Sequence, residues 1–193
     1  MQRAGSEKVP YRESLDLGRL VLEDEVPSNG ETWFLARVFR LAHAAGIRGV
    51  VSFSDPMPRA RADGTFLTPG HVGITYQAGG AVFTGRGTKR SLVLLPDGCV
   101  LSARAMQKIR RGEQGHEYAK QLLTSRGARP MQAGEDPARW MAGAISDIGA
   151  RRVRHQGCLR YAFPLGRRGR PVVALAAEPY PKVPDLGVLE RAA

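Results

Sequence analysis

The sequence predicts an α/β fold followed by a basic, helical C-terminal extension. Residues 15–22 and 47–54 are apolar runs of strand length, and residues 31–45 between them have helical periodicity. A strand, a helix and a strand at this spacing form a β-α-β unit with parallel strands and a right-handed crossover. Beyond residue 100 the pattern changes to short helices rich in arginine.

The first helix has clear signals at both ends. Ser28 or Asn29 can cap it, and Gly46 suits the left-handed turn that ends a helix. An apolar stripe predicts which side packs on the sheet. This stripe consists of Phe34, Val38, Leu41 and Ala45.

Shorter elements follow as far as residue 100. The polar residues 59–70 predict an irregular flap over one end of the sheet. A short helix, two strands and a tight turn come next, over residues 71–78, 81–84, 91–95 and 96–98.

Three helices are predicted in the extension. Ser102 caps the first, and Asp136-Pro137 opens the third with proline at the first helical position. Their ranges are 103–111, 115–126 and 138–148. A basic strand or hairpin arm over 151–165, a basic run at 167–170 and a surface tail complete the chain. We expect residues 1–100 and 101–193 to form a core and its extension within one structural unit.

Composition excludes several classes of protein. The 193 residues, 42% of them hydrophobic, suffice for one ordinary domain, but no apolar run reaches the roughly 18 residues of a membrane span. The first residues lack the apolar core of a secretory signal. Two cysteines, Cys99 and Cys158, form neither a disulfide framework nor a four-cysteine zinc site. The four histidines have no metal-binding spacing, so no metal site is predicted.

Positive charge is concentrated in one segment. Residues 101–170 contain 15 Lys/Arg against 5 Asp/Glu, whereas residues 1–100 contain 12 against 10. Such a field attracts polyanions, most often nucleic acid. The residues expected to contact DNA, with Tyr161 stacking on bases, are Arg104, Lys108, Arg110, Arg111, Arg151, Arg152, Arg154, Arg160 and Tyr161.

Two residues are candidates for acid–base chemistry. Asp55 follows a predicted central strand, where parallel sheets place active sites, and can accept a proton from the exocyclic amine of a base. Tyr76 can donate a proton to a leaving group or simply pack. The loop Ser28-Asn29-Gly30 precedes a helix N-terminus, which suits a phosphate group. No P-loop or dinucleotide-binding glycine motif is present.

Four ordered blocks resemble the Mom family of phage DNA-modification proteins. They are Leu17-Gly18-Arg19 with residues 24–35, Val51-Ser52-Phe53-Ser54-Asp55-Pro56, Gly70–Ala78, and Thr84-Gly85-Arg86. The resemblance covers residues 15–95 best and the arginine-rich tail more loosely. Family members carry more sequence before the first block, including a His-Tyr pair and the first strands of the fold. We therefore expect either an N-terminally shortened sheet or a start further upstream.

The resemblance implies a fold, an activity and roles for four residues. The fold would be a mixed sheet like that of GNAT acyltransferases. The activity would transfer a carbamoylmethyl group to the exocyclic amine of adenine. Asp55 and Tyr76 match the family's functional Asp and Tyr, and Ser28 and Asn29 lie in the loop that GNAT proteins use for the donor's pyrophosphate. That loop departs from the GNAT pattern, so the cofactor stays open, an acyl-CoA-like donor being one candidate.

Together these features predict a transferase that modifies adenine in double-stranded phage DNA. The target base would be flipped out of the duplex, Asp55 would deprotonate its amine, and Tyr76 would protonate the leaving group. We expect a phage- or prophage-encoded protein in the cytoplasm of the bacterial host. One alternative is a non-catalytic phage DNA-binding protein. Another is an S-adenosylmethionine-dependent adenine methyltransferase, whose D-P-P-[YFW] motif residues 55–58 echo without the glycine-rich cofactor loop.

Overall fold

The structure, a computed structural model, describes residues 11–23, 25–166 and 173–182. The basic run at residues 167–170 lies outside the described residues. The chain forms two compact units. Unit 1 contains the described parts of residues 1–56, 70–88 and 157–193, and unit 2 contains residues 57–69 and 89–156. Residues 57–69 and 89–100 therefore group with the helices that follow residue 100, and the chain returns to unit 1 after residue 156.

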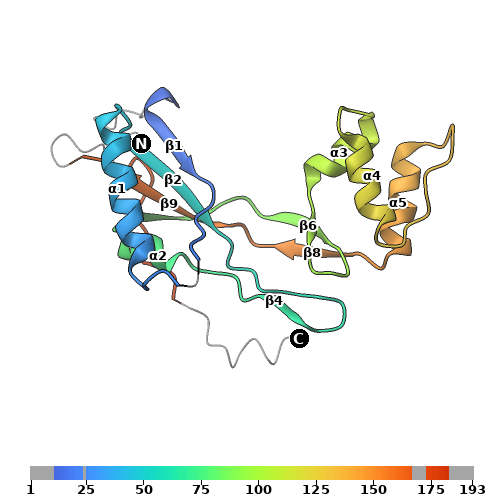
Figure 1. Cartoon of the computed structure of the whole chain (residues 1–193), viewed down its shortest axis with the longest axis horizontal. Helices are drawn as coiled ribbons and strands as arrows, with labels where there is room; N and C mark the ends of the chain where they lie inside the picture. Colours follow the sequence, from blue (N-terminus) through green and yellow to red (C-terminus); the bar gives the residue numbers. More distant parts are fainter. Residues whose placement is uncertain (1–10, 24, 167–172, 183–193) are drawn as a thin grey trace. The chain divides into compact units, whose positions relative to one another are not determined.

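Unit 1 is built on a mixed four-stranded sheet of order β1-β2-β9-β5 (Figure 1). The strands are β1 (Ser14–Leu17), β2 (Gly49–Ser54), β5 (Val82–Arg86) and β9 (Leu159–Pro164), with a 3-10 turn η1 (Tyr11–Glu13) before β1. β1 and β2 are parallel, which confirms the predicted β-α-β unit. β9 is antiparallel to both β2 and β5. The mixed α/β class expected from the sequence is confirmed.

Helices α1 (Gly30–Ala44) and α2 (Ile74–Ala78) belong to the same unit. α1 packs through Leu35, Phe39 and Ala42. The predicted apolar stripe is wrong, since Phe34 is 44% and Leu41 73% exposed. Periodicity alone could not separate these two faces, because apolar residues occur on both. The buried core of the unit is Val50, Val72, Tyr76, Ala81, Phe83, Leu159, Tyr161, Phe163 and Leu165.

Unit 2 has its own core. A three-stranded antiparallel sheet, β7-β6-β8, packs with α3, α4 and α5 around Ile109, Leu123 and Trp140. The strands are β6 (Arg90–Leu94), β7 (Val100–Leu101) and β8 (Arg151–His155), and the helices are α3 (Ala103–Arg111), α4 (His116–Thr124) and α5 (Pro137–Asp147). The expected caps are confirmed: the side chains of Ser102 and Asp136 accept hydrogen bonds from the backbone N–H groups of Ala105 and Arg139.

Two segments differ from expectation. The predicted flap at 59–70 contains a small hairpin, β3 (Arg59–Ala60) and β4 (Phe66–Thr68). Its turn is stabilised by the Asp63 carboxylate, which accepts a hydrogen bond from the Thr65 N–H. The predicted basic arm at 151–165 divides into β8 and β9, which join different sheets. The sequence predicted one strand or hairpin arm here, but strand partners so distant in sequence leave no local signal.

The loop before α5 gives a pH-dependent contribution to stability. The hydrogen bond from the Arg129 guanidinium, with one from the Gln132 N–H, lowers the pKa of Glu135 from 4.5 to about 2. Because the folded-state pKa is depressed, the stabilisation is present above pH 4.5 and is lost as the pH falls toward 2. The Trp140 indole N–H also donates to the Arg129 carbonyl, which ties this loop to the core.

We therefore expect Glu135→Gln to lower the melting temperature modestly at neutral pH. The difference from the wild-type melting temperature should shrink below pH 4.5 and vanish near pH 2. Thermal unfolding followed by circular dichroism across this range measures it. A difference that stays constant with pH would contradict the assignment.

Candidate functional site

Asp55 directly follows β2, at the point where that strand stops pairing with β9. The last pair of the ladder is Ser54 with Leu159. Asp55 is partly exposed, and its backbone carbonyl accepts a hydrogen bond of 2.8 Å from the His71 N–H. The carboxylate therefore stands at the end of a buried strand, as the sequence predicted.

Cys158 occupies the matching place on the neighbouring strand. It directly precedes Leu159, the first residue of β9, just as Asp55 directly follows Ser54, the last residue of β2. Because Ser54 pairs with Leu159, Asp55 and Cys158 lie at the same end of the ladder. Its carbonyl accepts a hydrogen bond of 2.8 Å from the Gly87 N–H. Gly157 must be glycine here, because its φ is +97° and a Cβ would lie 2.1 Å from the Gly87 carbonyl oxygen. This close backbone approach fixes the position of Cys158.

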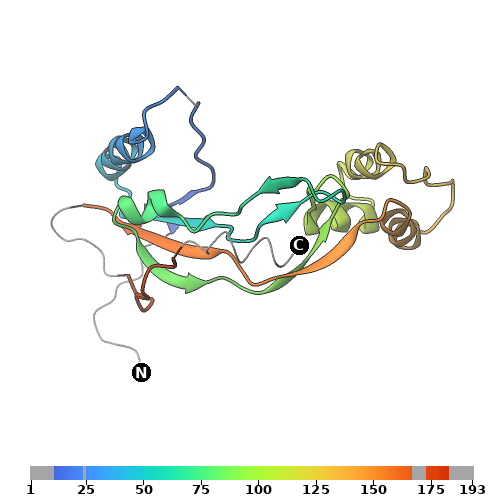
Figure 2. The ribbon, with the colours of Figure 1, turned by 90° about the horizontal axis from the view of Figure 1, so that it is seen from below.

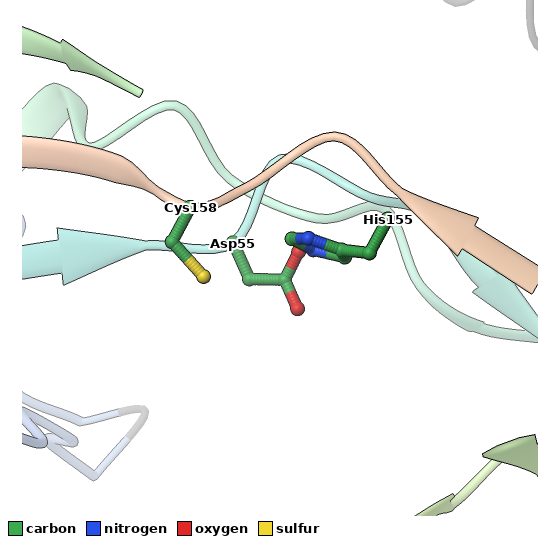
Figure 3. Close-up of side chains that lie close together, drawn as sticks. All are labelled: Asp55, His155 and Cys158. Carbon is green, nitrogen blue, oxygen red and sulfur yellow. The ribbon is translucent and has the colours of Figure 1, made fainter. Parts of the chain in front are cut away.

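His155 completes a three-residue cluster. It is the last residue of β8, three positions before Cys158, and only 1% of its surface is exposed. The ligand atoms of Asp55, His155 and Cys158 all lie within 4.8 Å of one another. Figure 3 shows the carboxylate of Asp55 beside the imidazole ring, with the thiol of Cys158 on the same side.

This cluster brings together a carboxylate, an imidazole and a thiol. The carboxylate and imidazole together can accept and pass on a proton. The same three groups are also the ligand types of transition-metal sites with an open fourth position. The sequence predicted no metal site, because Asp55 is remote from the other two residues in sequence. The H-x-x-C spacing of His155 and Cys158 was the one local signal.

Tyr76 does not have the setting that a general acid needs. It is 7% exposed and packs edge-to-face against Tyr161 and Phe163, with ring centroids 5.5 Å and 6.0 Å away. Gly73, at φ +73°, allows this packing, because a Cβ there would lie 2.9 Å from the Tyr76 ring. Tyr76 is a core residue of unit 1, and its position fits packing rather than proton donation.

Arg160 and Tyr161 also differ from their predicted roles. Tyr161 is fully buried and donates its hydroxyl hydrogen to the Val72 carbonyl, so its ring is not open to a stacking base. Burial raises the pKa of this phenol. The Arg160 guanidinium donates to the hydroxyl and carbonyl oxygens of Thr84, at 2.9 Å and 2.8 Å. This contact joins β9 to β5.

The other predicted DNA-contacting residues lie in unit 2. Arg104, Lys108, Arg110 and Arg111 are on α3, and Arg151, Arg152 and Arg154 are on β8. All are exposed except Lys108, which is partly buried. Glu113 pairs with Arg104 at 2.8 Å and with Arg111 at 3.7 Å, which neutralises part of the charge on α3.

The loop Ser28-Asn29-Gly30 is where α1 begins. Ser28 and Asn29 are exposed, and Asn29 occupies the cap position without a side-chain cap hydrogen bond. Packing favours glycine at position 30, since a Cβ there would lie 2.3 Å from the Val26 side chain. In the first turn, the Glu31 carboxylate accepts a hydrogen bond from the Thr75 hydroxyl.

A mixed α/β fold, a partly buried carboxylate–imidazole–thiol cluster and arginine-rich exposed elements fit an α/β protein that acts on a polyanion. A family model identifies it further: the model of the Mom protein family matches residues 2–182. The chain belongs to the Mom family, and its class of activity is the modification of phage DNA.

No curated protein and no solved structure matches the chain. The GNAT likeness therefore stays a prediction. Within the described residues, none of the helices has both the length and the apolar character required to cross a membrane.

The three-residue cluster predicts a metal-binding property that can be measured. We expect the purified chain to bind Zn²⁺, and Co²⁺ in its place with a thiolate-to-cobalt charge-transfer band. Cys158→Ser should abolish that band, and Asp55→Ala should weaken binding. Cys99→Ser is the matched control, since Cys99 is an exposed thiol in the turn after β6. Equal cobalt spectra for wild type and Cys158→Ser would contradict this.

Proposed function

We propose that this chain transfers a carbamoylmethyl group to the exocyclic amine of adenine in double-stranded phage DNA. Membership of the Mom family supports DNA modification in general. The observation that carries the assignment of a reaction centre is the partly exposed Asp55 carboxylate, within 4.8 Å of His155 and Cys158. Such a cluster of polar groups at a strand end is typical of a catalytic site rather than a packing site.

Asp55 is the proposed general base, in the form of the site that holds no metal. The adenine amine is a weak nucleophile because its lone pair is delocalised into the ring, so a positioned acceptor must remove a proton as the new bond forms. In the proposed step the N6–carbon bond forms, the bond from that carbon to the donor's leaving group breaks, and the amine proton passes to Asp55. His155, beside that carboxylate, orients it and can take the proton further.

The target amine is paired inside the duplex, so the base must be flipped out to reach Asp55. Positive residues would hold the DNA backbone during this step. Arg160 and Tyr161 leave the proposed set because both are engaged within unit 1. The retained phosphate-contacting residues are Arg104, Lys108, Arg110, Arg111, Arg151, Arg152 and Arg154.

The donor is proposed to bind at the start of α1. Ser28, Asn29 and Gly30 lie at the start of α1, where backbone N–H groups and the helix dipole favour a phosphate. An acyl-CoA-like donor would place its pyrophosphate there. Glu31 adds a negative charge in the same turn, but its carboxylate is engaged by Thr75.

Asp55→Asn tests the reaction centre. The amide keeps the size of the side chain but cannot take a proton, so we expect modified adenine to fall by about 10²–10⁴-fold while DNA affinity is kept. Mass spectrometry of nucleosides from cells expressing each variant measures the modification. Asp16→Asn, the same change at an exposed position of β1, is the control and should have no effect. Unchanged modification in Asp55→Asn would reject the assignment.

Tyr76→Phe separates the core role of Tyr76 from the general-acid role that the sequence suggested. The ring packing against Tyr161 and Phe163 is kept, so modification should stay near the wild-type level. A loss as large as that of Asp55→Asn would restore Tyr76 as the acid. DNA binding by the wild type without any new adenine species would instead favour a non-catalytic DNA-binding protein.

A further inference from the structure

Helices α3 and α4 of unit 2 are in contact and are joined by a short turn. Four residues, 112–115, connect them, and Gly112 and Gly115 both have positive φ, +61° and +82°. A short turn with glycine between two helices is one feature that DNA-reading helix–turn–helix pairs share. Ile109 of α3 and Leu123 of α4 are fully buried with Trp140 of α5, so the three helices share one core. Figures 1 and 2 show these helices grouped together.

The outer face of α4 is polar and carries an exposed aromatic ring. Ala119 and Leu123 face the core, whereas Tyr118 is 72% exposed. The exposed residues of this face are Glu117, Tyr118, Gln121 and Ser125, the last just after the helix end. Residues one helical turn apart lie side by side, so Tyr118 and Gln121 form a continuous surface.

The far end of α4 is anchored, so this face is held in a fixed orientation within unit 2. Arg126 follows the helix and donates to the Leu122 carbonyl at 3.0 Å. It also donates through Nε to the Asp97 carboxylate at 2.9 Å. Burial raises the pKa of Asp97, but hydrogen bonds from the Cys99 N–H and from Arg126 outweigh it and lower the pKa. The ion pair is therefore formed at neutral pH.

Positive residues lie in and near this helix pair. Unit 2 contains 15 Lys/Arg against 7 Asp/Glu. Lys108, Arg110 and Arg111 lie in the last turn of α3, directly before the turn that leads into α4. Because Arg111 pairs with Glu113, the exposed Arg110 is the better candidate for a phosphate contact.

We propose that α4 enters the major groove of duplex DNA and that Tyr118 and Gln121 read base edges there. This inference rests on the proposed function and adds to it the residues that select the DNA sequence around the modified adenine. A glutamine amide can make two hydrogen bonds to adenine, and an aromatic ring can contact the methyl group of thymine. The occupant is duplex DNA rather than RNA, whose deep and narrow major groove does not admit side chains.

The test is selection of duplexes from a randomised pool by the full-length chain, followed by sequencing and by affinity measurements at several salt concentrations. The wild type should enrich a short motif that contains A·T pairs. Gln121→Ala and Tyr118→Ala should each relax the preference at one position by about tenfold and leave the salt dependence unchanged. Arg110→Gln should weaken binding to all sequences alike and lower the salt slope by about 0.9.

Gln132→Ala is the matched control, since Gln132 is an exposed glutamine of unit 2 that lies outside α4. Circular dichroism checks that each variant is folded. A wild type without a preferred motif, or a motif unchanged in both α4 variants, would overturn the inference. The proposed function fails separately, if DNA from cells expressing the wild type contains no new adenine species while the motif is still selected.

Discussion

The pairing of β2 with β9 is the constraint on which unit 1 depends. Six residue pairs, from Gly49 with Pro164 to Ser54 with Leu159, join the strand after α1 to a strand from the C-terminal part of the chain. Without this ladder β5 would lose its connection to β2, since β9 lies between β2 and β5. The ladder also sets the candidate site, because Asp55 and Cys158 are the residues next to its last pair.

The sheet separates packing from chemistry by simple alternation. Along β9, Leu159, Tyr161 and Phe163 face the core, where the Phe163 ring contacts Phe39 of α1 and Tyr76 of α2. Cys158 belongs to the alternate set, which is less buried. The same rule explains why Tyr161 is a structural residue, and its ring contacts that of Tyr76 from α2 inside the core. Unit 2 differs, since helices α3, α4 and α5 supply most of its buried core and most of its arginines are exposed.

Local chemistry made much of the fold predictable. Ser102 and Asp136 marked helix starts that the structure confirms, because capping depends only on residues three positions away. The parallel pairing of β1 and β2 followed from strand and helix lengths. The position of β9 in the sheet could not be predicted. Pairing between strands that are remote in sequence gives no recognisable pattern in the sequence of either strand. The apolar side of α1 was misassigned because Phe34 and Leu41 are as apolar as Leu35 and Phe39.

The candidate site was predicted only at Asp55. His155 had no histidine partner at a metal-binding spacing, and Cys158 had no cysteine partner, so neither attracted a role. His155 and Cys158 come close to Asp55 because β9 pairs with β2 and because Gly157 lets the backbone approach Gly87 closely. The basic residues were found from charge alone, which cannot tell an arginine bound to the protein's own backbone from one left exposed. Arg160 is the example, since Thr84 holds its guanidinium.

A single engineered crosslink examines whether the end of β2 really adjoins the start of β9. Opposite residues of antiparallel strands have Cα atoms about 4.5–5.5 Å apart, a separation that a disulfide can bridge. In Asp55→Cys, mild oxidation should therefore join position 55 to Cys158, and peptide mass spectrometry should find that linkage and leave Cys99 free. Recovery of positions 55 and 158 as separate thiols, or a link to Cys99 instead, would contradict the strand register and the site built on it.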